Sequence, residues 1–353
     1  MKRCISDKIV DALRGEIECG RWKAGGRLPP VDELRKRFGA GEFAVRAALK
    51  KLRDDGCIVL KKGVGAVVSQ VASRHWKGRI AFIATNTSGS YFYHALFIRL
   101  SLVFRQDGWD FVPIYVSRGR DDELDFLPLR RSASSGLDFA VLITDEVRVA
   151  EACDEIALPY IVLNGYVKEF PNAKAVVRED FEKCFSDLIS ALRSRRVRRM
   201  LEVDTKRSMD RSFKNMFYRA GFSVQRMMCT LDGEIPNSLE DVKRSGYLGV
   251  AKFLADEKNR KRLPDVIIFD DDYLAVGGIA ALLECGLRIP QDVRVVTYSN
   301  TGNAPIIGVS LARIENDPAA YGDAVANYVL NLLAGRRPSP PRVRWRFIPG
   351  DSL

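Results

Sequence analysis

The chain has 353 residues, of which 46% are hydrophobic and 29% are charged, as in a folded protein long enough for two or three domains. No stretch approaches the roughly 18 consecutive apolar residues that a membrane-spanning helix needs. The first ten residues, "MKRCISDKIV", carry charges where a signal peptide has its apolar core. We therefore expect a cytoplasmic protein with no membrane partner.

The net charge of +11 is distributed unevenly along the chain. Residues 1–78 contain 18 Lys and Arg but only 9 Asp and Glu, a balance of +9, so that only +2 is left for the remaining residues. A small basic module joined to a nearly neutral body indicates contact with nucleic acid.

The 7 cysteines and 2 histidines have no spacing typical of a metal site or a disulfide framework. No two cysteines have C-x-x-C spacing, and His75 and His94 have no metal-ligand neighbours. We expect buried free thiols, no metal ion and no cofactor.

Three helices and a hairpin are predicted in the first 70 residues. Apolar residues recur at helical spacing over 7–18, Pro30 can begin a second helix that Gly39 ends, and a third helix has apolar residues at i, i+3, i+4 and i+7 from Val45 and stops at Gly56. The segment "CIVLKKGVGAVVS" that follows has the pattern of a hairpin. Three helices followed by a hairpin predict a winged helix-turn-helix.

Four segments in this region occur in the order and at the spacing of a known DNA-binding domain: "GGRLPP", "ELRKRFG", "VRAALKKLRDDG" and "KKGVG". On them, residues 7–68 resemble the DNA-binding domain of the GntR family, and we take 1–68 as that domain. The resemblance implies binding to a double-stranded DNA operator. Asp32 replaces a usual Arg, and Gly41-Glu42 and Ala44 replace the usual Ser-Arg and Thr, which indicates an operator different from the usual one.

The third helix opens with an acid where a polyanion is expected to bind. Glu42, Arg46 and Lys50 are spaced i, i+4 and i+8 and share the face opposite the apolar stripe. Either Glu42 pairs with Arg46 in solvent, or it accepts a hydrogen bond from a cytosine N4 while Arg46 recognises a guanine. The candidate DNA-binding residues are Arg27, Arg35, Glu42, Arg46, Lys50, Lys62, Gly63 and Gly65, with Lys36, Arg37, Lys51 and Lys61 as further phosphate contacts.

After a polar connector at 69–78, the chain alternates short apolar strands with helical stretches. Alternating strands and helices predict parallel sheets with right-handed crossovers, here an α/β body of two lobes, with ligands at the carboxyl ends of the strands. The predicted strands are "RIAFIAT", "FVPIYV", "FAVLIT" and "YIVLN", then "RRMLEV", "DVIIFD" and "VRVVTY", with helices at 92–107, 208–220, 239–255 and 272–285.

Residues 79–348 resemble the effector-binding core of LacI-type regulators, which is similar to periplasmic binding proteins. The resemblance is strongest over 263–300, "LPDVIIFDDDYLAVGGIAALLECGLRIPQDVRVVTYSN", and in the closing helix "YGDAVANYVLNLLAG". It implies that 79–353 bind a small effector, expected to be a carbohydrate, and form a homodimer.

The same resemblance suggests which residues contact the effector. Asp272 matches an acid that accepts hydrogen bonds from effector hydroxyls, and Phe92 matches an aromatic residue that packs on the ligand. Arg207 or Arg211 lies in the region of an effector-binding Arg, and Ser299 stands where an acid is usual. Carboxylates and an aromatic wall suit a sugar, although the acids at 270–272 are also explained by a strand end and a helix N-cap.

These observations favour a ligand-responsive transcription regulator, expected to be a repressor. A periplasmic sugar-binding protein has no DNA-binding module, and an enzyme needs a catalytic cluster that does not accompany the three acids at 270–272. "RSRRVRR", 193–199, is interpreted as a solvated turn. An alternative remains: a regulator-like protein with degraded DNA contacts, indicated by Asp32 and Glu42, that acts as a sugar-binding or protein-interaction module.

Overall fold

A computed structural model of the chain shows two compact units, and each is described by itself. The first contains residues 1–79 with 105–110, and the second contains 80–104 with 111–353. The structure describes residues 5–18, 21–69, 76–85, 90–118, 123–144, 146–163, 169–205, 216–231, 233, 236 and 238–353.

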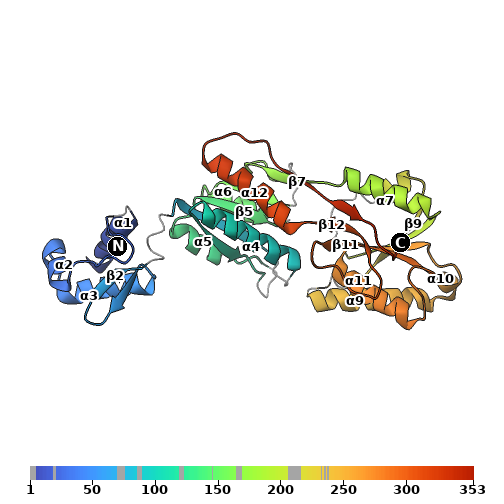
Figure 1. Cartoon of the computed structure of the whole chain (residues 1–353), viewed down its shortest axis with the longest axis horizontal. Coiled ribbons are helices and arrows are strands. Elements are labelled where there is room, and N and C mark those ends of the chain that lie inside the picture. The colour runs from blue at the N-terminus through green and yellow to red at the C-terminus, as the bar shows by residue number, and fades with distance from the viewer. Residues whose placement is uncertain are drawn as a thin grey trace. The chain divides into compact units, whose positions relative to one another are not determined.

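The amino-terminal part, here called the head (residues 5–68), is a three-helix domain with a two-stranded wing (Figure 1). Its elements are α1 (Ile5–Glu18), α2 (Val31–Phe38), α3 (Glu42–Asp54), β1 (Ile58–Lys61) and β2 (Gly65–Val68). The two strands pair antiparallel, from Ile58 opposite Val68 to Lys61 opposite Gly65. The winged helix-turn-helix prediction is therefore confirmed, although Pro30 is the N-cap of α2 and not its first helical residue.

One apolar cluster holds the head together. The buried faces of the three helices and of the wing meet there, which is the arrangement that the helical spacing of the apolar residues predicts. Its buried members are Ile9, Val10, Leu13, Ile17, Leu28, Leu34, Val45, Ala48, Leu49, Leu52, Ile58, Ala66 and Val68.

The body has two six-stranded sheets with the same strand order. The first sheet runs β4-β3-β5-β6-β7-β13, and the second runs β9-β8-β10-β11-β12-β14. The strands of the first sheet are β3 (Gly78–Ala84), β4 (Trp109–Tyr115), β5 (Phe139–Ile143), β6 (Tyr160–Leu163), β7 (Val176–Asp180) and β13 (Arg342–Arg344). Those of the second are β8 (Arg199–Asp204), β9 (Ser223–Met228), β10 (Val266–Phe269), β11 (Arg294–Asn300), β12 (Ala312–Asn316) and β14 (Arg346–Ile348).

The strand pairings have the parallel direction that alternating strands and helices predict. Pairs from β3 to β5, β6, β7 and β13 are parallel, and so are those linking β9, β8, β10, β11 and β12. Only β14 is shown to run antiparallel to its neighbour, β12, among the pairings of the second sheet. The predicted α/β class with parallel sheets is confirmed.

Helices pack on both sheets. They are α4 (Tyr91–Gln106), α5 (Leu127–Ser134), α6 (Val147–Glu155), α7 (Glu182–Ser194), α9 (Leu239–Ala255), α10 (Glu257–Lys261), α11 (Asp272–Glu284) and α12 (Pro318–Leu333). The helices expected at 92–107, 239–255 and 272–285 are present; of the one expected at 208–220, the structure describes 216–220, of which 216–219 are helical. No helix among the described residues has the length and apolar content required to span a bilayer.

The chain crosses between the two sheets three times, and each crossing helps to define two lobes. The first crossing runs from β7 of the first sheet to α7, whose apolar face packs on the second sheet. The second runs from β12 of the second sheet to α12, which packs beside α4 of the first lobe. The third runs from β13 of the first sheet to β14 of the second. The first lobe is therefore the first sheet with α4, α5, α6 and α12. The second lobe is the second sheet with α7, α9, α10 and α11.

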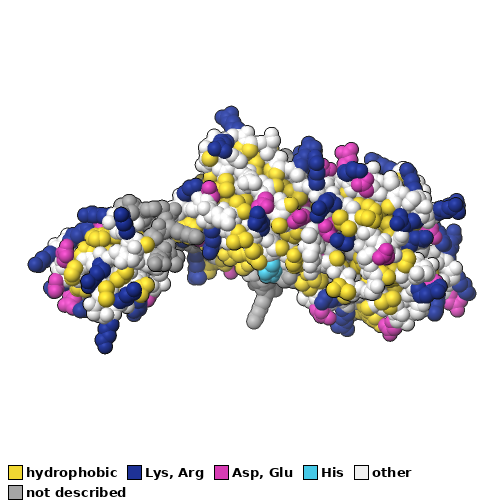
Figure 2. All heavy atoms as spheres, viewed as in Figure 1, with side chains coloured by type: hydrophobic (Ala, Val, Ile, Leu, Met, Phe, Trp, Pro, Cys, Tyr) yellow, Lys and Arg dark blue, Asp and Glu magenta, His cyan; other side chains and the backbone are white. Residues whose placement is uncertain are grey.

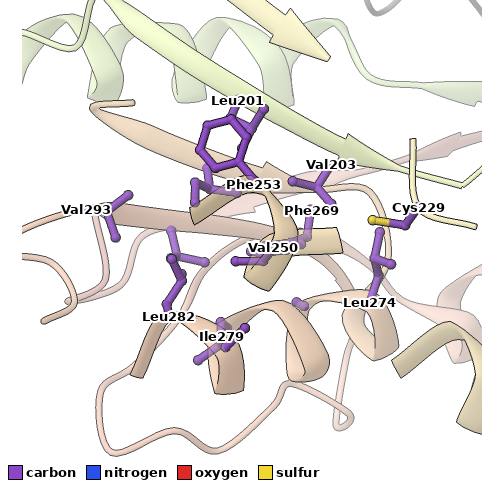
Figure 3. Packing of buried hydrophobic residues seen from close by; sticks show 14 of the residues in the cluster. Leu201, Val203, Cys229, Val250, Phe253, Phe269, Leu274, Ile279, Leu282 and Val293 are labelled. Carbon is purple, nitrogen blue, oxygen red and sulfur yellow. The ribbon is translucent and has the colours of Figure 1, made fainter. Parts of the chain in front are cut away.

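In the second lobe, α9 and α11 pack closely together against one face of the sheet. Figure 3 shows Leu201, Val203 and Phe269 of the sheet facing side chains of the two helices, among them Val250 and Leu274. A Cβ at Gly277 of α11 would lie 1.8 Å from the Lys243 carbonyl oxygen of α9, so only glycine fits there. This packing fixes α11, whose first residues lie at the carboxyl end of the sheet.

Candidate functional site

Helix α3 presents a polar face to solvent. Glu42, Arg46 and Lys50 are exposed, while Val45 and Leu49 belong to the buried apolar stripe. The N-cap, Gly41, has extended backbone and gives no side-chain cap, and Glu42 in the first turn has the sign of charge that the helix dipole favours. The sequence therefore places these side chains on the exposed face as expected.

Glu42 is paired with two arginines. Its carboxylate accepts a hydrogen bond from Arg46 Nε at 2.7 Å and lies 3.9 Å from Arg35 Nη1 of α2. Arg35 is also 3.3 Å from Asp32. The solvent pairing of Glu42 with Arg46 is thus present in the structure. The two unusual acids pair with candidate DNA-binding arginines: Asp32 lies near Arg35, and Glu42 lies near both Arg35 and Arg46.

Two other basic candidates hold α1 to the rest of the head. Arg37 donates to Glu16 from Nη1 at 2.9 Å, and this hydrogen bond is the main reason that the pKa of Glu16 is lowered to about 2. Lys51 donates to Asp7 at 2.9 Å. Arg37 and Lys51, expected as phosphate contacts, therefore support the fold of the head in this structure.

Four lysines on α2, α3 and the wing are exposed and form no ion pair with any residue that the structure describes. Lys36 lies on α2, Lys50 on α3, and Lys61 and Lys62 on the wing. In Figure 2, Lys and Arg side chains project from the head with acidic side chains among them. These lysines are the cations most readily available to a phosphate backbone.

The wing is anchored by Arg27. Its guanidinium donates to the backbone carbonyl of Val64 at the wing tip, and its backbone pairs with Val67. Gly63 and Gly65 have φ of 77° and 98°, a left-handed conformation that glycine adopts without strain. Arg27, Gly63 and Gly65 thus shape the wing and hold its tip.

Phe43 was not singled out by sequence reasoning. It is 88% exposed in the first turn of α3, between Glu42 and the buried stripe. The available signal was its helical position, which lies opposite Val45, Ala48 and Leu52.

In the body, buried polar residues gather at the carboxyl ends of the strands of the second sheet. Asp204 ends β8 and Thr205 follows it, Asp272 follows β10, Ser299 lies near the end of β11 and Asn316 ends β12. Each of these residues exposes 6% or less of its surface. Polar groups buried at this edge are typical of a ligand site in a parallel sheet.

The acids that follow β10 have different roles. Asp271 is the N-cap of α11 and accepts hydrogen bonds from the backbone of Tyr273 and Leu274. Asp272 is buried and accepts a hydrogen bond from Asn303 Nδ2 at 3.0 Å. Burial, and then the charge of Asp271, raise the pKa of Asp272 to about 7. The N-cap explanation therefore accounts for Asp271, while Asp272 remains a buried acceptor.

Tyr91 joins the carboxyl edges of the two lobes. Its backbone N–H donates to the Tyr273 hydroxyl at 3.2 Å, and its own hydroxyl donates to the Thr301 carbonyl at 3.1 Å. In the first lobe, Thr85 and Thr144 follow β3 and β5 and share a hydrogen bond of 2.9 Å. Tyr91, Asn303 and Asn316 were not predicted, because only the fold brings them to Asp272 and its neighbours.

The other predicted effector contacts are distributed over both lobes. Asp272 and Ser299 lie at the same sheet edge, and the Ser299 hydroxyl is 3.4 Å from the Asn300 carbonyl. Phe92, at the start of α4, packs its ring on Tyr321 of α12 at 5.6 Å between centroids. Arg207 and Arg211 lie outside the described residues. Among the residues that are described, no group of three or more His, Cys, Asp or Glu has the arrangement of a metal site.

Two family models match the chain. Residues 5–68 match the bacterial regulatory proteins of the gntR family, and residues 191–353 match a periplasmic binding protein-like domain. The first match covers the head and the second covers most of the second lobe together with α12, β13 and β14.

Curated relatives include transcriptional repressors. The chain is 31% identical over 93 residues to the HTH-type transcriptional repressor PurR of Klebsiella pneumoniae subsp. pneumoniae, and 31% identical over 93 residues to that of Erwinia tasmaniensis. Each match covers 26% of this chain and 26% of the relative, so it spans about a quarter of the length of these repressors.

Solved structures share the fold at low sequence identity. A Lac repressor bound to ONPG matches 88% of this chain and 90% of its own, with a TM-score of 0.64 and 15% identity. A LacI family transcriptional regulator from Arthrobacter sp. FB24, in complex with lactose, matches 78% and 98%, with a TM-score of 0.62 and 15% identity. The Escherichia coli transcriptional repressor ascG matches 78% and 99%, with a TM-score of 0.59 and 17% identity.

Proposed function

Because a GntR-type helix-turn-helix head precedes a body with the periplasmic-binding-protein-like fold of LacI-family regulators, we propose that this chain is a DNA-binding transcriptional repressor controlled by a small ligand. A role on chromosomal DNA requires the protein to be in the cytoplasm, and this role involves no catalytic step. One observation carries this function above the others: the head presents α3 and the wing with Lys36, Lys50 and Lys62 exposed.

The ligand is proposed to bind at the carboxyl edges of the two lobes. Asp272, Ser299 and Asn316 supply hydrogen-bonding groups from the second lobe, and Tyr91 supplies them from the first. A carbohydrate matches this set, since its many hydroxyls need carboxylate and amide partners. The fold neighbour solved with lactose supports the same class of ligand.

Control of DNA binding is proposed to act through the relative position of the lobes in a homodimer. A ligand that binds one lobe arrangement better than the other shifts the balance between them. A coupling of about 1–3 kcal/mol changes operator affinity by about 5- to 150-fold. The proposed dimer interface includes Ile98 and Leu102, one helical turn apart on α4, which are 58% and 49% exposed.

The salt dependence of DNA binding tests whether the head binds DNA. The full chain is titrated with duplexes selected from a random 30-base-pair library, between roughly 50 and 200 mM salt, and log K should fall steeply with log salt. Lys62→Ala should reduce the slope by about 1 per head. Lys258→Ala, on α10 in the body, is the matched control and should leave the slope unchanged.

A second candidate function is favoured by the pairing of Glu42. With Arg35 and Arg46 both near its carboxylate, the head could have lost DNA binding and serve a protein partner or only accompany a sugar-binding body. A flat plot of log K against log salt, with no duplex enriched by selection, supports this candidate and contradicts the first.

A thermal-shift screen against sugars, lactose included, tests whether the body binds a carbohydrate. A bound sugar should raise the melting temperature by mass action, and Asp272→Asn should reduce that rise. Asp256→Asn, at the exposed N-cap of α10 in the same lobe, should leave it unchanged. If no sugar shifts the wild-type protein, the carbohydrate assignment is wrong, whatever the DNA titration shows.

A further inference from the structure

Phe43 is a large apolar side chain on the solvent-exposed face of α3, opposite the buried stripe. It is 88% exposed, whereas the other large apolar residues of α3, Val45, Leu49 and Leu52, are all buried. Among the described large apolar residues, only Ile306 of the body is more exposed, at 98%. The phenyl ring therefore contributes little to the core of the head.

The surroundings of Phe43 on α3 are cationic and sterically open. Phe43, Arg46, Ala47 and Lys50 are spaced i, i+3, i+4 and i+7, so they form one face of the helix. Ala47 is small, which leaves room for close approach of a surface to that face. A molecule that binds to this face must carry negative charge near Arg46 and Lys50 and present an apolar group to Phe43.

We propose that Phe43 recognises thymine by contact with its 5-methyl group in the major groove; this inference rests on the proposed DNA-binding function. Thymine presents the apolar methyl group in that groove, whereas the other base edges present hydrogen-bond donors and acceptors that a phenyl ring cannot satisfy. A phosphate backbone flanking the methyl group matches the charge of Lys50.

Glu42 acts beside it as a positioning residue for Arg46. The carboxylate accepts from Arg46 Nε at 2.7 Å, which leaves the two terminal amino groups of the guanidinium for a base. Those groups are the ones that bind guanine O6 and N7. Phe43 and Arg46 are about 4.5 Å apart along the helix axis, and base pairs are about 3.4 Å apart, so each half-site is expected to contain a thymine and a guanine within two base pairs.

Replacement of thymine by uracil tests this inference directly, because it removes only the methyl group. Duplexes selected from the random library by the full chain are resynthesised with uracil at one thymine at a time, and affinity is measured by fluorescence anisotropy at fixed salt. Wild type should lose about 4-fold at one thymine of each half-site, the amount expected for one buried methyl group. Phe43→Ala should bind thymine and uracil duplexes equally, and Phe43→Leu should keep part of the preference.

Ile306→Ala is the matched control, since it also truncates a highly exposed apolar residue, and it should retain the wild-type thymine preference. Glu42→Gln should weaken the guanine preference while the thymine preference stays. Equal loss on uracil in wild type and Phe43→Ala overturns the inference but leaves the repressor function intact. A change of oligomeric state in Phe43→Ala, with the thymine preference unaltered, also overturns it and makes Phe43 a protein contact. If selection enriches no duplex, the proposed function itself fails.

Discussion

Glu42 and Asp272 are both carboxylates at the start of a helix, yet their surroundings give them opposite properties. Glu42 is exposed and pairs with arginines on α2 and α3. Asp272 is buried, and the only hydrogen-bond donor shown for its side chain among the described side chains is the amide of Asn303. The two carboxylates therefore differ in burial and in their partners, and burial disfavours the charged form of Asp272.

The raised pKa of Asp272 predicts that part of the body's stability depends on pH. The unfolded chain loses this proton near the ordinary value of 3.8, and the folded chain holds it to about pH 7. Between these values the folded state binds more protons, so the free energy of unfolding falls as pH rises, by about 1.4 kcal/mol per unit. Urea denaturation should show Asp272→Asn gaining about 2 kcal/mol relative to wild type between pH 5 and 6.5. For the control, Asp256→Asn, the free energy of unfolding should differ from that of wild type by the same amount at both pH values. A difference that also stays constant for Asp272→Asn would contradict the raised pKa of Asp272.

Sequence alone was sufficient for contacts within one element and insufficient for those between elements. The Glu42–Arg46 pair was one of the two alternatives that the sequence left open for Glu42, since an i, i+4 spacing on a helix brings the two side chains together. The partners of Asp272 and Tyr273 were not predicted, because Asn303 and Tyr91 reach them only through the tertiary fold.

At the scale of elements, the contact between α9 and α11 determines where the first residues of α11 lie. Gly246 and Gly277 let the two backbones approach, and a Cβ at Gly246 would lie 2.3 Å from the Leu274 carbonyl oxygen. Phe269 of the sheet occupies the space beside Gly278. The glycines in "AVGGIAALL" therefore permit close helix packing, although glycine lowers intrinsic helix stability.

Gly277→Ala should destabilise the body by about 1–3 kcal/mol or more, because the Cβ cannot be placed without separating α9 from α11. Calorimetry or urea denaturation measures this change. Gly15→Ala in α1 is the control: nothing lies within 4 Å of its Cβ, so the substitution should stabilise the head by about 0.5–1 kcal/mol. Equal effects at the two positions would show that helix propensity, and not packing, dominates.

The strands that sequence missed are those with the weakest apolar pattern. Central strands such as β5 and β10 are buried throughout and stand out as apolar runs. By contrast, β9 reads "SVQRMM" and is mostly exposed, and β13 and β14 have three residues each. Two strands inside the sheets, β7 and β12, were also not predicted, because "VVRED" and "ARIEN" contain too many polar residues for an apolar run. The edge strand β4 was predicted, since "FVPIYV" is such a run.

At the scale of the whole molecule, the proposed dimer depends on surface that one chain leaves exposed. Ile98 and Leu102 stand one turn apart on α4, whose other face packs on the first sheet through Leu96, Leu100 and Phe104. Exposed apolar pairs on a helix are typical of an interface between subunits.

Ile98→Glu with Leu102→Glu should convert the dimer to monomers, since two charges cannot be buried there without partners. Light scattering coupled to size-exclusion chromatography measures the mass, and circular dichroism confirms that the fold is retained. Leu127→Glu, on α5 and equally exposed, is the control and should leave the mass unchanged. A wild-type monomer, or an unchanged mass in the double variant, would place the interface elsewhere.

The three crossings between the lobes imply a sequence of events during synthesis. The head draws its whole core from residues 9–68, so it can fold as soon as it leaves the ribosome. Neither lobe can do the same: the first waits for α12 and β13, and the second waits for β14 and Leu353. A nascent chain should thus display a finished head well before its body is complete.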